Sequence, residues 1–317
     1  MEYKIKGKII QGVGGLYTVA DLCGLEDEGR IRLPQTLECR ARGVFRHNRI
    51  KPLVGDEVEI TFEEGDGESG MKNVQIAEIL PRKNSLIRPP LANLDTVFVA
   101  MASSCPKPMP DAVDKLLSIL EFNGIDAVVV IGKCELDPDE AQKLKEIYTL
   151  AGYRVFVLSC KTGEGVDEIK NFVRENMNGK IAAFAGASGV GKSTLMNEIF
   201  PGLDLETSGV SEKIERGKNT TRTTRLFPLE GGGYLADTPG FSMLDFERFD
   251  FFTKEDLPST MREFKALLGN CRYTKCTHTK DEGCAILEAL REGKIAKSRH
   301  DSYLELYAVL KEKKAWK

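Results

Sequence analysis

The sequence predicts a multi-domain protein. An N-terminal β-barrel is expected over residues 1–80, a central α/β domain over 81–245, and a C-terminal, mainly helical, metal-binding domain over 246–317. Three observations predict this class. The chain begins with short alternating strands and glycine-rich turns. Near residue 190, a buried strand is followed by a glycine loop and a helix. Cys and His residues cluster near residue 280. A chain of 317 residues is long enough for two or three domains.

The N-terminal region alternates apolar and polar residues, as strands with one buried face do. The pattern predicts strands at 44–46, 57–62 and 74–79 and turns at 12–15, 27–29 and 65–67. Several short strands at this spacing are typical of a small closed barrel.

The central domain contains a loop suited to holding phosphate. Residues 181–185 predict a buried strand and 194–200 a helix, and the loop between them fits G-x-x-x-x-G-K-[ST]. Its glycines let main-chain N–H groups wrap an anion, and the helix N-terminus adds a favourable dipole. The alternative is a glycine-rich turn that matches by chance. The expected phosphate contacts are Gly186, Ala187, Ser188, Gly189, Val190, Gly191, Lys192, Ser193 and Thr194.

A second motif, Asp-Thr-Pro-Gly at 237–240, ends another expected strand at 233–237. An Asp at this position can hold Mg²⁺ through water, and a Gly N–H can contact a γ-phosphate. The loop at 216–224 is rich in Thr and Arg, and it is either a solvated loop or a segment that closes over Mg²⁺ and phosphate. Together the motifs indicate a GTPase-type site with Lys192 on the β/γ-phosphates and Mg²⁺ on Ser193 and Thr221. The expected catalytic residues are Lys192, Ser193, Thr220, Thr221, Asp237 and Gly240.

The guanine-reading elements lie upstream of the phosphate loop. A continuous apolar strand at 127–131 leads into the sequence Gly-Lys-Cys-Glu, and an expected strand at 155–158 leads into Ser-Cys-Lys. No such pair follows Gly240. The nucleotide motifs therefore occur in a rotated order, which fits a circularly permuted domain. The expected base contacts are Gly132, Lys133, Cys134, Glu135, Ser159, Cys160 and Lys161.

Four metal-ligating residues lie within fourteen positions in the C-terminal region: Cys271, Cys276, His278 and Cys284. Three thiolates and an imidazole suit tetrahedral zinc, and four protein ligands leave no open position, so one structural Zn²⁺ per chain is expected. The alternative is a set of unrelated buried thiols beside a surface His. Helices are expected from 246 to 268, from 285 to 292 and from 298 to 314.

Composition favours a globular protein without membrane spans. The chain is 41% hydrophobic and 29% charged, and it has neither a run of about 18 apolar residues nor an apolar N-terminal leader. The remaining five cysteines are isolated, as free thiols of a reducing cytoplasm would be. Basic residues are concentrated between 30 and 51 and on an expected exposed C-terminal face. Either set is a solvated surface or an RNA-phosphate contact. The C-terminal set is Arg272, Lys275, Lys294, Lys297 and Arg299.

Taken together, these motifs resemble the bacterial ribosome small-subunit-dependent GTPase A family, a circularly permuted ribosome-assembly GTPase. The resemblance also includes segments 52–58 and 81–89 and covers nearly the whole chain. It implies an OB-fold in the N-terminal domain and hydrolysis of GTP to GDP with Mg²⁺. It further implies the 30S ribosomal subunit and 16S rRNA as partners, stimulation of hydrolysis by that subunit during late maturation, and a cytoplasmic monomer that does not bind membranes.

Two departures from the family pattern matter. Gly132 and Glu135 stand where the family has Asn and Asp, and loss of a charged hydrogen bond costs roughly 1.5–3 kcal/mol. These substitutions favour a weakened or relaxed guanine preference, and GTP is still the predicted nucleotide. Phe241 and Asn219 stand where water-orienting residues could lie, so unstimulated hydrolysis is expected to be slow. An unselective NTPase and an RNA-binding scaffold that uses nucleotide only structurally remain the alternatives.

Overall fold

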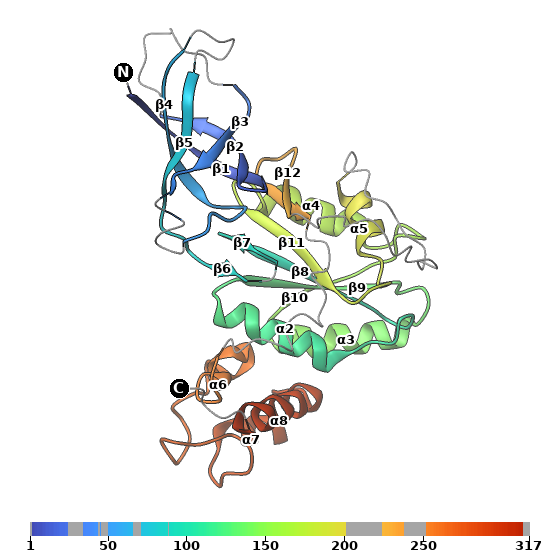
Figure 1. Cartoon of the computed structure of the whole chain (residues 1–317). Helices are drawn as coiled ribbons and strands as arrows, with labels where there is room; N and C mark the ends of the chain where they lie inside the picture. The colour runs from blue at the N-terminus through green and yellow to red at the C-terminus, as the bar shows by residue number, and fades with distance from the viewer. Residues whose placement is uncertain are drawn as a thin grey trace, which may run out of the picture. The chain divides into compact units, whose positions relative to one another are not determined.

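The computed structural model describes residues 2–24, 34–43, 45, 50–65, 71–87, 89–200, 224–237 and 252–312 (Figure 1). It divides into two compact units. The first comprises described residues within 1–95, 177–183 and 215–240, and the second comprises those within 96–176, 184–214 and 241–317. In the described part of the chain, no helix is both long and apolar enough to cross a membrane.

Five strands of the first unit form a closed barrel. Their order is β1-β2-β3-β5-β4, and β1 also pairs with β4, which closes the sheet. Along β1 and β4, alternate side chains such as Ile5, Ile9 and Phe62 are buried, so the barrel has an apolar interior. The predicted N-terminal barrel is confirmed. The strands are β1 (Glu2–Val13), β2 (Leu16–Cys23), β3 (Leu37–Ala41), β4 (Glu57–Glu64) and β5 (Met71–Ile79).

The predicted strand at 44–46 is wrong at its described residue. Phe45 is helical, because its N–H donates to the carbonyl of Arg42 and its own carbonyl accepts from Ile50. The side chain is only 8% exposed. Apolar character at this one position therefore did not distinguish a strand from another backbone conformation.

Residues 53–56 and 82–94 are joined by buried polar contacts. The carboxylate of Asp56 is fully buried and accepts two hydrogen bonds from Arg82, at 2.6 and 2.8 Å. Gly55 has a φ of +90°, and a Cβ there would lie 2.1 Å from the carbonyl oxygen of Ala92, so only glycine fits. The same unit contains the small strands β6 (Ser85–Leu86), β7 (Leu91–Ala92), β12 (Arg225–Pro228) and β13 (Tyr234–Asp237).

The second unit is built on strands in the order β10-β9-β8-β11, in which β9 pairs in parallel with both β10 and β8. All seven residues of β8 are buried, as expected for a central strand covered on both faces. The predicted apolar strands at 127–131 and 181–185 are confirmed. The elements are β8 (Thr96–Ala102), α2 (Pro110–Phe122), β9 (Asp126–Gly132), α3 (Pro138–Leu150), β10 (Arg154–Val157), α4 (Val166–Asn176), β11 (Ile181–Gly186, of which 181–183 belong to the first unit) and α5 (Lys192–Ile199).

The C-terminal helices belong to the second unit, where α6 and α8 contact α2 (Figure 1). Helices at 285–292 and 298–314 are confirmed in their described residues. The expected continuous helix at 246–268 is wrong in its described residues, since Pro258 and the extended backbone at Met261 interrupt it. The elements are α6 (Leu257–Thr260), the 3₁₀ turn η2 (Arg262–Phe264), α7 (Ala285–Arg291) and α8 (Lys297–Glu312).

Arg299 corrects the predicted basic surface. Its side chain is 1% exposed, and its guanidinium lies 2.7 Å from Asp114 of α2 and 2.8 Å from Glu263. Burial penalises a charged group unless opposite charges lie close to it, and two carboxylates meet that condition here. Arg299 therefore fastens α8 to α2 and is excluded from any exposed RNA-contacting face.

Candidate functional site

The phosphate-type loop connects β11 to α5 through three glycines that the backbone requires. Gly186, Gly189 and Gly191 all have positive φ, and a Cβ on Gly186 would lie 2.3 Å from the carbonyl oxygen of Ala100. Gly191 is the N-cap of α5, so Lys192, Ser193 and Thr194 lie in the first turn of that helix. The loop therefore places main-chain N–H groups and a helix N-terminus at the end of a buried strand.

The side chain of Lys192 reaches back from α5 to this loop. Its ammonium donates hydrogen bonds of 2.8 Å to the carbonyls of Gly186 and Ala187. Burial lowers the pKa of this side chain, because removing an ammonium from water penalises its charged form. An anion at the loop would reverse that penalty, which gives the site a preference for negatively charged ligands.

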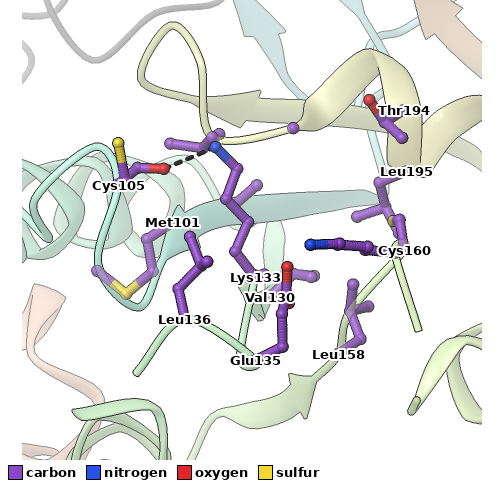
Figure 2. Close-up of a pocket in the computed structure, with 15 residues that line it drawn as sticks. Met101, Cys105, Val130, Lys133, Glu135, Leu136, Leu158, Cys160, Thr194 and Leu195 are labelled. Carbon is purple, nitrogen blue, oxygen red and sulfur yellow. Dashed lines mark hydrogen bonds between the residues drawn. The ribbon is translucent and has the colours of Figure 1, made fainter. Parts of the chain in front are cut away.

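The ends of β9 and β10 meet this loop around one cavity of about 340 Å³. In Figure 2, Lys133 and Glu135 from the end of β9 and Thr194 and Leu195 from α5 surround it. The structure thus brings together predicted residues more than fifty positions apart. Its lining is Ala100, Met101, Cys105, Val130, Gly132, Lys133, Glu135, Leu136, Leu158, Cys160, Lys161, Val190, Gly191, Thr194 and Leu195.

Lys133 links three segments of the cavity wall. Its ammonium donates to the carbonyl of Cys105 at 2.6 Å, drawn as a dashed line in Figure 2, and to the carbonyl of Gly189 at 2.8 Å. Its backbone has a φ of +58°, which non-glycine residues adopt rarely and at a cost. The side chain therefore spans from the end of β9 to the phosphate-type loop.

Glu135 places a carboxylate at the cavity. Its pKa lies below the usual range, chiefly because the Ser159 hydroxyl and then its own main-chain N–H donate hydrogen bonds to it. Within the described part of the chain, its Oε2 atom is buried and has no hydrogen-bond partner. Glu135 lines the cavity, so its carboxylate can accept hydrogen bonds from N–H groups of a ligand bound there.

Two predicted base contacts lie behind the cavity wall. Ser159 is fully buried and accepts a hydrogen bond from the N–H of Thr162 at 3.1 Å. Cys134 is buried, and its thiol lies 3.8 Å from Glu164. Burial, and then the nearby Glu164, raise the pKa of Cys134, so its thiol stays protonated. These residues support the loops around the cavity rather than line it.

Of the second phosphate motif, the structure describes only Asp237, which ends β13 in the first unit. Burial raises the pKa of this carboxyl. Thr220, Thr221 and Gly240 lie outside the described residues.

The four predicted metal ligands come together. Their ligand atoms all lie within 4.8 Å of one another. Nδ1 of His278 lies 3.4 Å from Sγ of Cys284 and 3.6 Å from Sγ of Cys271, and the last two sulfurs are 3.9 Å apart. A tetrahedral zinc with bonds of about 2.3 Å to sulfur separates two sulfurs by about 3.8 Å. The cluster can hold a metal ion, and its spacing fits zinc.

The chemistry of the cluster also fits a cation. Burial raises the pKa of the Cys276 thiol to about 12 and lowers the pKa of His278, so without a cation the Cys276 thiol stays protonated and burial favours a neutral imidazole. A bound metal ion would stabilise the thiolates. The N–H of Ala285 donates to Sγ of Cys271 at 3.4 Å, a contact that orients a ligating sulfur.

Comparisons with known proteins agree with this geometry. The RsgA GTPase model matches residues 79–247, and the RsgA N-terminal domain model matches residues 6–69. The chain belongs to the RsgA GTPase family. It is therefore a GTP hydrolase with a circularly permuted GTPase domain, as the order of its motifs predicted.

Similar proteins cover nearly the whole chain. The Small ribosomal subunit biogenesis GTPase RsgA of Caldanaerobacter subterraneus is 41% identical over 98% of this chain and 97% of its own, and that of Agathobacter rectalis is 42% identical over 98% and 99%. YjeQ from Thermotoga maritima has a TM-score of 0.78 at 31% identity, over 98% of this chain and all of that one. YloQ, a circularly permuted GTPase, has a TM-score of 0.75 at 32% identity, over 99% and 97%.

Sequence reasoning missed the part of the cavity that β8 and the following loop supply. Met101 and Cys105 line the cavity, and Ser103 lies behind it. No motif marks these residues. The available indication was that a buried parallel strand at 96–102 must end at the same sheet edge as the motif-bearing strands.

Proposed function

We propose that this GTPase acts in late maturation of the small ribosomal subunit, with the 30S subunit and 16S rRNA as partners and with hydrolysis stimulated by the subunit. The observation that carries the nucleotide site is the single cavity lined by both Glu135 and the loop that ends at Gly191. The names of the relatives, which are small ribosomal subunit biogenesis GTPases, support the ribosomal role.

In this proposal the residues have separate roles. The loop from Gly186 to Thr194 wraps the phosphates, Lys192 neutralises the β/γ-phosphates, and Ser193 and Thr221 hold Mg²⁺. Asp237 supports the metal through water. Thr220 and Gly240 contact the γ-phosphate side, and ordering of their segments by the 30S subunit accelerates turnover.

Glu135 is proposed to read guanine. Guanine presents N1–H and a 2-amino group as adjacent donors, and the buried Oε2 of Glu135 is an acceptor in need of a donor. Adenine presents a bare N1 in the same place, whose lone pair would face the carboxylate. The unpaired acceptor therefore favours GTP over ATP despite the Gly132 substitution. Lys133 is proposed to pack along the base, and Gly132, Cys134, Ser159, Cys160 and Lys161 complete the base-binding loops.

The metal at Cys271, Cys276, His278 and Cys284 is proposed to be one structural zinc ion, because three soft thiolates and an imidazole prefer zinc to harder cations. The barrel (1–80), the GTPase domain (81–245) and the zinc-binding domain (246–317) are the proposed functional divisions. The protein is proposed to be a cytoplasmic monomer.

The test is GTP hydrolysis with and without purified 30S subunits, with ATP as the alternative substrate and the Lys192→Ala variant as the background control. We expect GTP turnover to rise at least tenfold with 30S subunits and ATP turnover to stay at background. A GTP rate that 30S subunits leave unchanged would reject the ribosomal role, and equal ATP turnover would reject guanine selectivity.

A further inference from the structure

Gly132 leaves the end of β9 without a side chain at the position where the family pattern has Asn. A Cβ at this residue would lie 3.5 Å from the carbonyl oxygen of Val190 and 3.8 Å from that of Met101, which are ordinary contacts. Packing therefore does not require glycine here. The loop that begins with Lys133 must be held in place by other groups.

Ser103 supplies such groups from the neighbouring strand. It follows β8 directly and is 1% exposed. Its main-chain N–H donates to the carbonyl of Gly132 at 3.0 Å, and its hydroxyl donates to the carbonyl of Lys133 at 2.8 Å. One buried serine thus fixes two consecutive carbonyls at the point where the chain leaves β9.

The hydroxyl contact holds a backbone that is otherwise costly. Lys133 has a φ of +58°, and such a conformation persists only where surrounding contacts enforce it. A further bond joins the loop after β8 to the end of β9: the ammonium of Lys133 donates to the carbonyl of Cys105, two residues after Ser103. Segments 103–105 and 132–133 are therefore bonded at three points.

We propose that Ser103 is a positioning residue for guanine selectivity, and that its hydroxyl does the work that a side chain at residue 132 would otherwise do. The inference rests on the proposed reading of guanine by Glu135. Glu135 lies two residues after the carbonyl that Ser103 holds, so this bond sets where the carboxylate can lie. A fixed carboxylate accepts from guanine and repels the N1 lone pair of adenine, whereas a mobile carboxylate can move away from adenine.

The experiment measures binding of GDP, ADP and tripolyphosphate, each with Mg²⁺, to the full-length wild type and to Ser103→Ala, Ser103→Thr and Ser118→Ala. Thr keeps the hydroxyl. Ser118 is the matched control, because it is also fully buried and its hydroxyl also donates to a main-chain carbonyl, that of Asp114 at 3.0 Å, but this bond lies within α2 rather than at the end of β9. Thermal melting of each variant establishes that it is folded.

We expect Ser103→Ala to bind GDP about tenfold more weakly and to lose about tenfold in the ratio of GDP to ADP affinity, with tripolyphosphate affinity unchanged. Ser103→Thr and Ser118→Ala should keep the wild-type ratio. If Ser103→Ala does not fold, Ser103→Cys, which has similar volume but a weaker donor, must show a smaller loss of the same ratio.

A wild-type ratio in folded Ser103→Ala, or in Ser103→Cys where the first variant fails to fold, overturns the inference and leaves the proposed guanine site intact. An equal loss of GDP and ADP affinity also overturns it, because that result indicates a merely structural role. A wild-type protein that binds GDP and ADP equally rejects the guanine site and the inference together.

Discussion

The side-chain ammonium of Lys133 lies 2.8 Å from the main-chain carbonyl oxygen of Gly189 and donates a hydrogen bond to it. This bond joins the end of β9 to the phosphate-type loop across fifty-six positions of sequence. A circularly permuted chain reverses the order of these two segments, yet the bond depends only on their places in the sheet. The two ends of the proposed nucleotide site are therefore joined through one side chain.

Replacement of Lys133 by Met should weaken GDP binding about tenfold or more. Met keeps most of the aliphatic stem but removes the two hydrogen bonds that the ammonium donates, and a hydrogen bond of a charged group contributes roughly 1.5–3 kcal/mol. Isothermal titration of GDP into the two proteins measures the effect. Lys145→Met is the control, since Lys145 is exposed on α3 and does not line the cavity. Equal effects of the two substitutions would argue against the coupling.

Glu135→Gln should change base preference from guanine to xanthine. The glutamine amide offers one acceptor and one donor, which match xanthine N1–H and its 2-oxo group, whereas guanine presents two donors. We expect GDP affinity to fall at least tenfold and XDP affinity to rise above that of GDP. Competition against a fluorescent nucleotide analogue measures both. A variant that still prefers GDP would show that Glu135 does not read the base edge.

Gly132→Asn should tighten GDP binding. The Cβ fits without close contacts, and the amide would lie beside the carbonyl of Val190, where a new hydrogen bond contributes about 0.5–1.5 kcal/mol, or about two- to tenfold in affinity. The GDP dissociation rate in stopped flow should fall by a similar factor. Gly124→Asn, in an open turn away from the cavity, serves as the control. Faster GDP release from Gly132→Asn would count against this expectation.

Arg299→Ala should destabilise the protein by about 3–5 kcal/mol, because it leaves the buried carboxyls of Asp114 and Glu263 without their cation. Urea unfolding followed by circular dichroism measures the loss. Arg272→Ala is the matched control. The Arg272 side chain is 63% exposed and forms a long ion pair of 3.9 Å with Glu282, so its removal should cost less than about 1 kcal/mol. Similar costs for the two variants would disprove the role assigned to the buried cluster.

Removal of the metal by a strong chelator should lower the melting temperature and increase hydrogen exchange over 271–303. Tyr303 and Phe264 pack beside His278, so the ligands and the apolar core of α7 and α8 depend on one another. GDP affinity should change less than fivefold, since no ligand lines the nucleotide cavity. Cys284→Ser should give the same exchange pattern without chelator. Metal analysis of the purified protein identifies the ion, and a content below one zinc per chain would contradict the zinc assignment.

The sequence by itself determined the features that short segments carry. The loop from Gly186 to Ser193 and the ligands Cys271 to Cys284 are recognisable because their contacting atoms come from within a few turns of chain, so spacing alone brings them together. Alternation likewise predicted β4 and β5, because a strand with one buried face needs a period of two.

Only the tertiary structure decided the features that depend on distant partners. Arg299 carries the same charge as exposed basic residues around it, and its burial follows from Asp114, which is 185 positions away and on another helix. Ser103 has no motif, and its hydroxyl matters because parallel pairing of β8 and β9 places it at the carbonyl of Lys133. The unpaired Oε2 of Glu135 also depends on which groups pack around it. Local spacing fixes which atoms neighbour one another within a segment, whereas packing between segments fixes which polar groups are buried and what satisfies them.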